Sequence, residues 1–187
     1  GYYVLSLGVL LAFILNKNIS YDYSLLIILI MILAINLPFN LLGKNFLGDS
    51  GSYLVAFIAG YVFVDFYKFY PDISALFIVT LLWYPAFENL FSIIRKKIDN
   101  ADPSKPDTKH FHQLIFKFFL LRFKNKKKAN IVSSLIINFY NFIVFLIAYY
   151  LFNSSIGLTV LLILNVILYS YCYLTLSKII NSSEIKN

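Results

Sequence analysis

The sequence predicts an all-α protein, a polytopic bundle of transmembrane helices, and three observations support this fold class. Hydrophobic residues make up 60% of the chain and charged residues only 13%, which is far from the composition of a soluble globular domain. The apolar residues form continuous runs instead of the alternating pattern of a membrane β-barrel. Most of these runs approach the roughly 20 residues that a helix needs to cross the hydrocarbon core of a bilayer. We therefore expect one integral membrane domain over residues 1–187.

Six apolar runs mark the expected spans in chain order: Tyr2 to Leu15, Tyr23 to Leu42, Tyr53 to Tyr70, Ile73 to Ile94, Ile131 to Phe152 and Ile156 to Leu176. Inside lipid each run must satisfy its own backbone hydrogen bonds, which favours helices. The first run is shorter than a full span, and the chain begins at Gly1 without a methionine. We therefore expect the sequence to be the C-terminal portion of a longer protein.

Basic residues concentrate in the segment from Arg95 to Lys128, which holds eleven of the 16 lysine and arginine residues. By the positive-inside rule this segment should be cytoplasmic. Counting spans outward from it places the loop around Asp49 and the C-terminal tail on the same side, so that only Lys17 and Lys68 lie on the other. The net charge of +7 thus reflects membrane topology. Because no recognition motif accompanies the charge, we do not expect nucleic-acid binding.

The cytoplasmic segment, residues 95–130, contains Pro103 and Pro106, which prevent the fourth helix from continuing. Asp107 or Thr108 is expected to cap a short amphipathic helix that lies on the membrane surface. Its apolar face would carry residues at helical spacing: Phe111, Leu114, Ile115 and Phe118. We interpret the basic run from Lys124 to Lys128 as a stop signal attracted to anionic lipid, in preference to a specific phosphate site.

One loop between two apolar runs has the composition of a phosphate and metal site. Asp49 lies between Gly48 and Gly51, which let the backbone turn tightly and approach a ligand closely, and Lys44 precedes it. A hard cation such as Mg²⁺ is usually held by one or two carboxylates together with substrate phosphates. Glycine-flanked backbone amides beside a lysine would complement the phosphate oxygens. The alternative is a carboxylate that only stabilises the start of a helix.

Four further residues are candidates for chemistry. Glu88 lies inside the fourth span, where an ionisable group is costly and is a functional candidate by default, although a structural bond between helices would also explain it. Arg95 follows on the same helix face. His110 and His112 are the only histidines and lie in the cytoplasmic segment. Two residues apart, they do not share a helix face, which argues against a zinc pair and favours donors to a phosphate or a nucleotide. Histidines incidental to function are the alternative.

These motifs resemble, in the same order, those of the polyprenyl-phosphate N-acetylhexosamine-1-phosphate transferases, glycosyl transferase family 4. Asn36-Leu37-Pro38 followed by the segment from Lys44 to Ser52 resembles the magnesium-site signature of that family. Three further segments of this chain resemble the next cytoplasmic motifs of that family: Pro85 to Glu88, Phe91 to Lys97 and Pro106 to Leu114. The family includes phospho-N-acetylmuramoyl-pentapeptide-transferase and undecaprenyl-phosphate N-acetylglucosaminyl-1-phosphate transferase.

The chain also departs from the family pattern. It contains no adjacent pair of aspartates, and in the family such a pair belongs upstream of the position of Gly1. Gln113 stands where many relatives carry a third histidine, and Glu88 stands where many carry an aspartate. These departures indicate a branch of the family and leave the sugar open.

The resemblance implies an enzyme of the bacterial inner membrane whose active-site loops are cytoplasmic. It would transfer a sugar-1-phosphate from a UDP-N-acetylhexosamine to undecaprenyl phosphate and release UMP, in cell-wall or lipopolysaccharide biosynthesis. Asp49 would bind Mg²⁺, with Mn²⁺ as the alternative ion, and would be catalytic together with His110 and His112. Substrate binding would involve these residues: Lys44, Gly48, Ser50, Gly51, Ser52, Glu88, Arg95 and Asp107. The chain by itself is expected to be inactive, and a homodimer and a one-step or two-step reaction are left open.

Two other classes of function compete with this hypothesis. A small-solute transporter would place Glu88 and Asp65 along a polar path through the bundle. A catalytically silent membrane scaffold would need no site at all.

Overall fold

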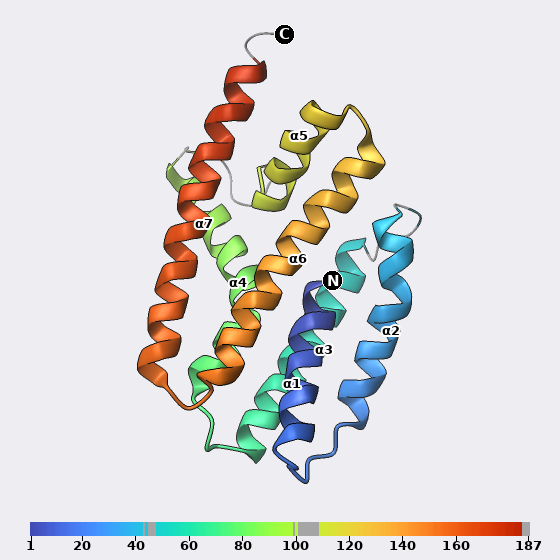
Figure 1. The fold of residues 1–187 in the computed structure, drawn as a ribbon, viewed down its shortest axis with the longest axis vertical. Helices are drawn as coiled ribbons and strands as arrows, with labels where there is room; N and C mark the ends of the chain where they lie inside the picture. The colour runs from blue at the N-terminus through green and yellow to red at the C-terminus, as the bar shows by residue number, and fades with distance from the viewer. Residues whose placement is uncertain (43, 45–47, 99, 101–108, 185–187) are drawn as a thin grey trace. The chain divides into compact units, whose positions relative to one another are not determined.

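The computed structural model describes residues 1–42, 44, 48–98, 100 and 109–184, apart from the side chains at positions 49, 183 and 184. Over these residues the chain forms helices and no strand (Figure 1). In chain order the helices are α1 (Tyr2–Asn16), α2 (Ser24–Leu41), α3 (Gly48–Phe69), α4 (Ala75–Ile98), α5 (Phe111–Phe123), α6 (Lys126–Tyr150) and α7 (Ser155–Glu184). The predicted all-α fold class is confirmed.

In the part of the chain that the structure describes, five helices are long and apolar enough to cross a membrane: α2, α3 from Ser50 onward, α4, α6 and α7. Helix α1 is apolar but shorter, as its run in the sequence predicts. Helix α6 begins at Lys126, ahead of the expected apolar start at Ile131, because lysine and alanine are good helix formers and no breaker separates them from the apolar run. The polar ends of helices therefore lie beyond the apolar runs that mark them in the sequence.

Contacts divide the chain into two compact units. The first unit comprises Gly1–Leu81 and Asn138–Leu161, and the second comprises Leu82–Ile137 and Leu162–Asn187. Each is described here by itself. The predicted loop around Asp49 belongs to the first unit, and the two histidines belong to the second.

The core of the first unit is aromatic. Phe13 of α1 is fully buried, and its ring centroid lies 6.2 Å from that of Phe66, 5.4 Å from Phe77 and 5.0 Å from Phe152. Edge-on and tilted arrangements of this kind are the favourable geometries for aromatic pairs. This cluster joins α1, α3 and the start of α4 within the unit.

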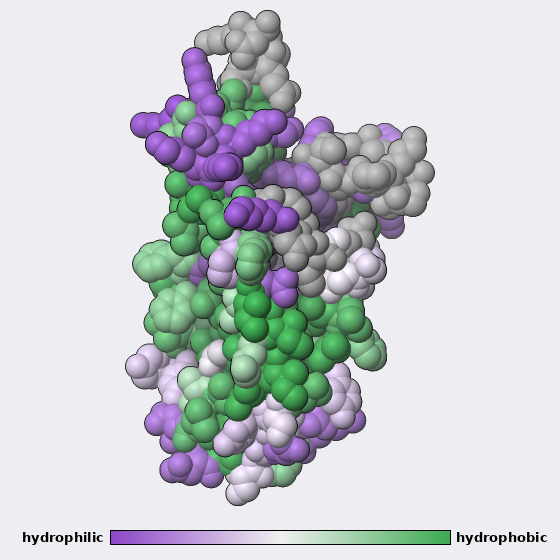
Figure 2. Space-filling view, turned by 90° about the vertical axis from the view of Figure 1, so that its right-hand side faces the viewer, coloured by the Kyte–Doolittle hydropathy of each residue, from purple (hydrophilic) through white to green (hydrophobic). Residues whose placement is uncertain are grey.

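Many large apolar side chains lie on the surface, among them Phe57, which is 75% exposed, Phe139, at 67%, and Ile156, at 81%. Figure 2 shows hydrophobic residues covering much of the face that it presents. In water such exposure would cost about 25 cal/mol for each Å² of apolar area, whereas lipid removes this cost. The protein is a multi-pass membrane protein.

The second unit is organised around another aromatic cluster. Tyr169 of α7 is buried, and its ring centroid lies 5.0 Å from that of Phe87, 5.2 Å from Phe91 and 4.7 Å from Phe111. Phe87 and Phe91 belong to α4, and Phe111 is the first residue of α5. The cluster therefore fixes the start of α5 against two membrane helices.

Helix α5 forms where the sequence predicts a short helix, but it begins later than expected. Its N-cap is His110, in an extended backbone conformation, and neither Asp107 nor Thr108 takes that position. The N-cap prediction was wrong because it used the preference of N-caps for small oxygen-bearing side chains. Here one partner of the helix start is Glu88 of α4, which short-range preferences do not include.

Candidate functional site

Glu88 is the buried acid of the second unit. Its side chain is only 8% exposed, and one carboxylate oxygen accepts a 2.6 Å hydrogen bond from the backbone N–H of Phe111. The first N–H groups of a helix have no partner inside the helix, and negative charge is favourable there. The expected interhelical bond of Glu88 therefore exists, and its partner is the backbone at the start of α5.

The two histidines converge on the same carboxylate. Nδ1 of His110 lies 3.3 Å and Nδ1 of His112 lies 3.9 Å from Oε1 of Glu88. The two imidazole rings are stacked, with centroids 5.5 Å apart and planes 12° from parallel. The spacing argument that kept the histidines on different faces was wrong, because it treated both as helical. His110 precedes the helix in extended backbone, so its ring can lie parallel to that of His112.

Local hydrogen bonds hold His110 in this position. Its backbone N–H donates to Oε1 of Gln113 at 3.2 Å, and its backbone carbonyl accepts the N–H groups of Gln113 and Leu114 at 2.9 and 3.0 Å. The hydroxyl of Tyr173 donates to the carbonyl of Lys109 at 3.1 Å. Sequence reasoning noted Gln113 only as a departure from the family and missed its capping role. A glutamine three residues after an N-cap is the signal that could have found it.

Exposure differs between the two imidazoles. The side chain of His110 is 23% exposed and that of His112 is 53% exposed. Together with exposed Lys109, they form a basic group at the start of α5. Because the N–H of Phe111 is already bonded to Glu88, anion binding here would depend on the imidazoles and the lysine more than on the start of the helix.

A polar pocket of about 210 Å³ lies beside His112 in the same unit. It is lined from two helices, α5 and α6, by these residues: His112, Gln113, Phe116, Asn130, Ser133, Ser134 and Ile137. The hydroxyl of Ser133 donates to the carbonyl of Ala129 at 2.7 Å. The exposed histidine therefore borders a space with polar walls.

The predicted Asp49 segment begins α3 in the first unit. Gly48 has a positive φ of 67°, and an added Cβ would meet nothing within 4 Å, so the backbone angle is what favours glycine here. The hydroxyl of Ser52 donates to the Gly48 carbonyl at 2.7 Å. Lys44 and Ser50 are exposed. The Asp49 side chain lies outside the described residues, so its ligand role stays a prediction.

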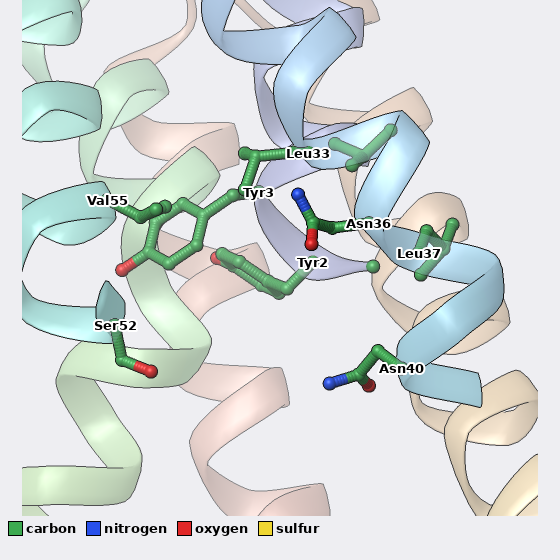
Figure 3. A pocket seen from close by; sticks show the side chains of 10 residues that line it. Tyr2, Tyr3, Leu33, Asn36, Leu37, Asn40, Ser52 and Val55 are labelled. Atoms are coloured by element: carbon green, nitrogen blue, oxygen red, sulfur yellow. The ribbon is translucent and has the colours of Figure 1, made fainter. Parts of the chain in front are cut away.

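A pocket of about 200 Å³ connects this segment to the Asn36 motif (Figure 3). Asn36 and Asn40 project into it from α2, and Ser52 projects from α3. The side-chain N–H of Asn36 also donates to the carbonyl of Ile32 at 3.0 Å. The fold thus brings together two parts of the predicted magnesium-site signature that a loop separates in the sequence. Asn40, one turn after Asn36, was not singled out from the sequence.

The remaining predicted residues have plainer positions. Arg95 lies in the last turn of α4 and is half-buried, and Gly51 lies within the first turns of α3. Asp107 lies outside the described residues. The sequence predicts that the Asp49 segment and the histidines both face the cytoplasm. This stays a prediction, because the segment belongs to the first unit and the histidines belong to the second.

Among the side chains that the structure places, no group of three His, Cys, Asp or Glu residues converges on a point that could hold a metal ion. A magnesium ion that is shared with substrate phosphates needs only one or two protein carboxylates. The predicted ligand, Asp49, lies in the first turn of α3, and its side chain lies outside the described residues.

The acids of the transporter hypothesis each have a local hydrogen bond. Oδ2 of Asp65 accepts a 2.8 Å bond from the hydroxyl of Tyr21, and Glu88 accepts the N–H of Phe111. Asp65 belongs to the first unit and Glu88 to the second. Each acid therefore has a structural role that does not require a path through the bundle.

Comparison with known proteins gives two relatives. The chain is 35% identical over 79 residues to an undecaprenyl-phosphate alpha-N-acetylglucosaminyl 1-phosphate transferase of Thermotoga maritima, a match that covers 42% of this chain and 26% of that protein. It is 26% identical over 139 residues to a probable undecaprenyl-phosphate N-acetylglucosaminyl 1-phosphate transferase of Bacillus subtilis, covering 74% of this chain and 37% of that protein. The chain thus matches well under half the length of each relative. No family model and no solved structure matches it.

Proposed function

We propose that this chain is the C-terminal part of a membrane enzyme that transfers a sugar-1-phosphate from a UDP-N-acetylhexosamine to undecaprenyl phosphate. The products are UMP and a diphosphate-linked lipid sugar, on which a cell-envelope glycan starts. The observation that carries the proposal is the convergence of His110 and His112 on Glu88, which is buried within the membrane helix α4. The likeness to two transferases named for undecaprenyl phosphate supports the substrate class.

In this reaction a phosphate oxygen of the polyprenyl phosphate attacks the sugar-side phosphorus of the UDP-sugar, and the bond to the leaving UMP breaks. Negative charge then grows on the UMP phosphate. Because Nδ1 of each imidazole faces Glu88, Nε2 lies on the opposite edge of each ring, where it can donate to a phosphate oxygen when the ring is protonated. Such charge-assisted donors, already oriented before the reaction, stabilise developing charge.

Glu88 acts in this scheme as a positioning residue. Its carboxylate accepts the first N–H of α5 and lies beside Nδ1 of both rings, so it positions the donors next to the start of that helix. Its negative charge also lies close to both rings, 3.3 Å from Nδ1 of His110 and 3.9 Å from Nδ1 of His112. Lys109 adds a further positive charge for the diphosphate.

Asp49 is proposed as one ligand of Mg²⁺, or of Mn²⁺ in its place. When bound, the ion offsets charge on the diphosphate and orients it. Gly48 sets the left-handed turn before Asp49, and Lys44 lies in the preceding loop, where it can meet a phosphate oxygen. We place the remaining carboxylate ligands in sequence that precedes this chain in the complete enzyme, which makes the chain inactive alone.

The enzyme would lie in the bacterial inner membrane with both loops in the cytoplasm, where UDP-sugars are available. This orientation follows from the distribution of lysine and arginine. Nucleic acid is not a partner in this scheme.

The test uses the complete enzyme, with the upstream sequence restored, in detergent or vesicles. UDP-N-acetylglucosamine, undecaprenyl phosphate and Mg²⁺ are supplied, and UMP release and lipid-linked sugar are measured. We expect Asp49→Asn, His110→Ala and His112→Ala each to lower kcat by about 100-fold or more, as loss of a charge-stabilising group does. Asp72→Asn, which removes an exposed carboxylate in an outer loop, is the matched control and should retain activity.

Two outcomes would contradict the proposal. Full activity of Asp49→Asn would exclude the metal role of that residue. Absence of lipid-linked product from the unaltered complete enzyme, with UDP-N-acetylglucosamine and UDP-N-acetylgalactosamine both supplied, would exclude this reaction.

A further inference from the structure

A second pocket of the second unit lies between α5 and α7 and takes no part in the proposed reaction. Its volume is about 300 Å³, and it is lined by Lys117, Leu120, Leu121, Lys124 and Ile180. Lys117, Leu120 and Leu121 of α5 follow the spacing i, i+3 and i+4, so they share one face of the helix, and Lys124 is the residue that follows its last turn. Ile180 of α7 is only 3% exposed and closes the apolar floor.

The two lysines lie at opposite ends of this apolar floor. They are seven positions apart in the chain, or about 10 Å along the axis of the helix. Among the residues that the structure places, neither lysine is paired with a carboxylate. The sequence from Lys109 to Lys128 holds seven basic residues and no acid, so its field favours an anion.

Lys124 occupies a position that a lysine does not favour. It is the C-cap of α5, with a φ of 53°, and its N–H donates to the carbonyl of Leu120 at 2.9 Å. This left-handed conformation is normally given to glycine or asparagine, and other residues pay about 1 kcal/mol for it. Its side chain lines the pocket and brings a positive charge to it.

Helix α5 also has the dimensions and surface of an interfacial helix. Its 13 residues span about 20 Å, too short to cross the bilayer, and membrane-spanning α4 and α6 flank it in the chain. Leu121 is 46% exposed and Phe123 is 40% exposed. Apolar exposure combined with lysine and arginine is typical of helices that lie at the headgroup level of a membrane.

We propose that this pocket binds an anionic phospholipid of the host membrane, of the phosphatidylglycerol class. The lipid phosphate would lie between the ammonium groups of Lys117 and Lys124. The first methylene groups of the acyl chains would cover Leu120, Leu121 and Ile180. A pocket with charged ends and an apolar floor matches both parts of such a lipid, whereas an acidic peptide would leave the floor uncovered. The proposal does not depend on the transferase function.

The experiment measures lipid retention by native mass spectrometry of the purified protein, released from nanodiscs that contain phosphatidylglycerol and phosphatidylcholine in equal amounts. We expect one retained phosphatidylglycerol and little phosphatidylcholine. The double variant Lys117→Gln/Lys124→Asn should weaken phosphatidylglycerol retention about tenfold or more, given about 1 kcal/mol for each lysine near an anionic surface. Asparagine is used at 124 because it tolerates the left-handed backbone.

The matched control is Lys127→Gln/Lys128→Gln, which removes the same charge outside the pocket and should retain the lipid. A second variant, Leu121→Trp, keeps both lysines but fills the floor and should also reduce retention. Equal losses in the two double variants would show diffuse attraction and overturn the site. Retention without preference between the two lipids, or displacement of phosphatidylglycerol by equimolar undecaprenyl phosphate, would overturn the assignment of its ligand.

Discussion

The carboxylate of Glu88 accepts a 2.6 Å hydrogen bond from the backbone N–H of Phe111, so a buried acid in α4 holds the first residue of α5. The same oxygen lies within 4 Å of Nδ1 in both histidines. One side chain thus fixes the start of a helix and the orientation of two imidazoles. A change at Glu88 should therefore affect helix stability and the proposed chemistry together.

Removing the Glu88 carboxylate should loosen the start of α5. Glu88→Ala leaves the N–H of Phe111 without its acceptor, and hydrogen bonds to charged groups are worth about 2 kcal/mol. Glu88→Gln keeps an acceptor oxygen and should cost less. Hydrogen exchange of the α5 amides in detergent measures the effect, with Asn89→Ala, an exposed neighbour on α4, as the control. Equal protection in Glu88→Ala and the control would contradict the role of this bond.

Gln113 should contribute to stability through its side chain. Gln113→Ala removes the acceptor of the His110 N–H, and loss of such a cap costs about 1 kcal/mol. Gln113→Glu retains a side-chain oxygen at the same distance and is the matched variant. Thermal unfolding followed by circular dichroism should rank alanine below glutamate. If both variants unfold together below the unaltered protein, the glutamine amide group itself, rather than its oxygen, is what matters.

Two glycines of α3 should respond oppositely to alanine. Gly48 has a φ of 67°, so Gly48→Ala should destabilise the turn before Asp49 by about 1 kcal/mol. Gly60 lies inside the helix with open space around an added Cβ, so Gly60→Ala should be neutral or stabilising by up to about 1 kcal/mol. Thermal unfolding of the two variants tests this contrast. A Gly48→Ala variant as stable as Gly60→Ala would show that the turn accepts a side chain.

The bond between Tyr21 and Asp65 should weaken at alkaline pH. Burial raises the pKa of Tyr21 above its ordinary value near 10, and the bond to Asp65 raises it further. A group whose pKa is raised on folding contributes stability that is fully present below its unfolded pKa and declines as pH rises above it. The difference in melting temperature between the unaltered protein and Tyr21→Phe should therefore be constant to about pH 10 and shrink beyond it.

Asp65→Asn provides the control for this pH dependence, because it removes the charge next to Tyr21 while keeping an acceptor oxygen. In that background the decline should be smaller, since the pKa of Tyr21 is raised less. A difference between unaltered protein and Tyr21→Phe that grows above pH 10 would contradict the direction of the shift.

The orientation of the chain can be tested with single cysteines. With Cys172 replaced by serine, Ser20→Cys and Lys127→Cys place one thiol in each of two exposed positions. The distribution of basic residues predicts that an impermeant maleimide labels position 20 in intact spheroplasts and labels position 127 only after permeabilisation. The reverse pattern would invert the proposed topology and place both candidate sites outside the cytoplasm.

The sequence could predict the membrane class and the spans because both depend on composition along the chain. An apolar run of sufficient length becomes a helix in lipid whatever surrounds it, since no other structure satisfies its backbone. The exact ends were less predictable. Lys126 extends α6 and His110 caps α5, because helix ends depend on polar partners that the apolar pattern does not contain.

The candidate site was predictable as a set of residues and less so as a geometry. Composition singled out Asp49, Glu88 and the two histidines, since acids at membrane depth and isolated histidines are rare in such a chain. What sequence alone did not provide was the partnership between Glu88 and α5. That bond joins residues 23 positions apart. Phe111, which donates it, is held in place by packing against Tyr169.

The sequence by itself thus determined that this is a helical membrane protein with acids and histidines concentrated next to its basic loop, because transfer of side chains into lipid is decided residue by residue. The tertiary structure decided that His110 and His112 stack on each other beside one carboxylate and that Asn36 shares a pocket with Ser52. The physical reason is that a buried charge or amide finds its partner through space. The chain between the partners imposes only a loose limit on the distance.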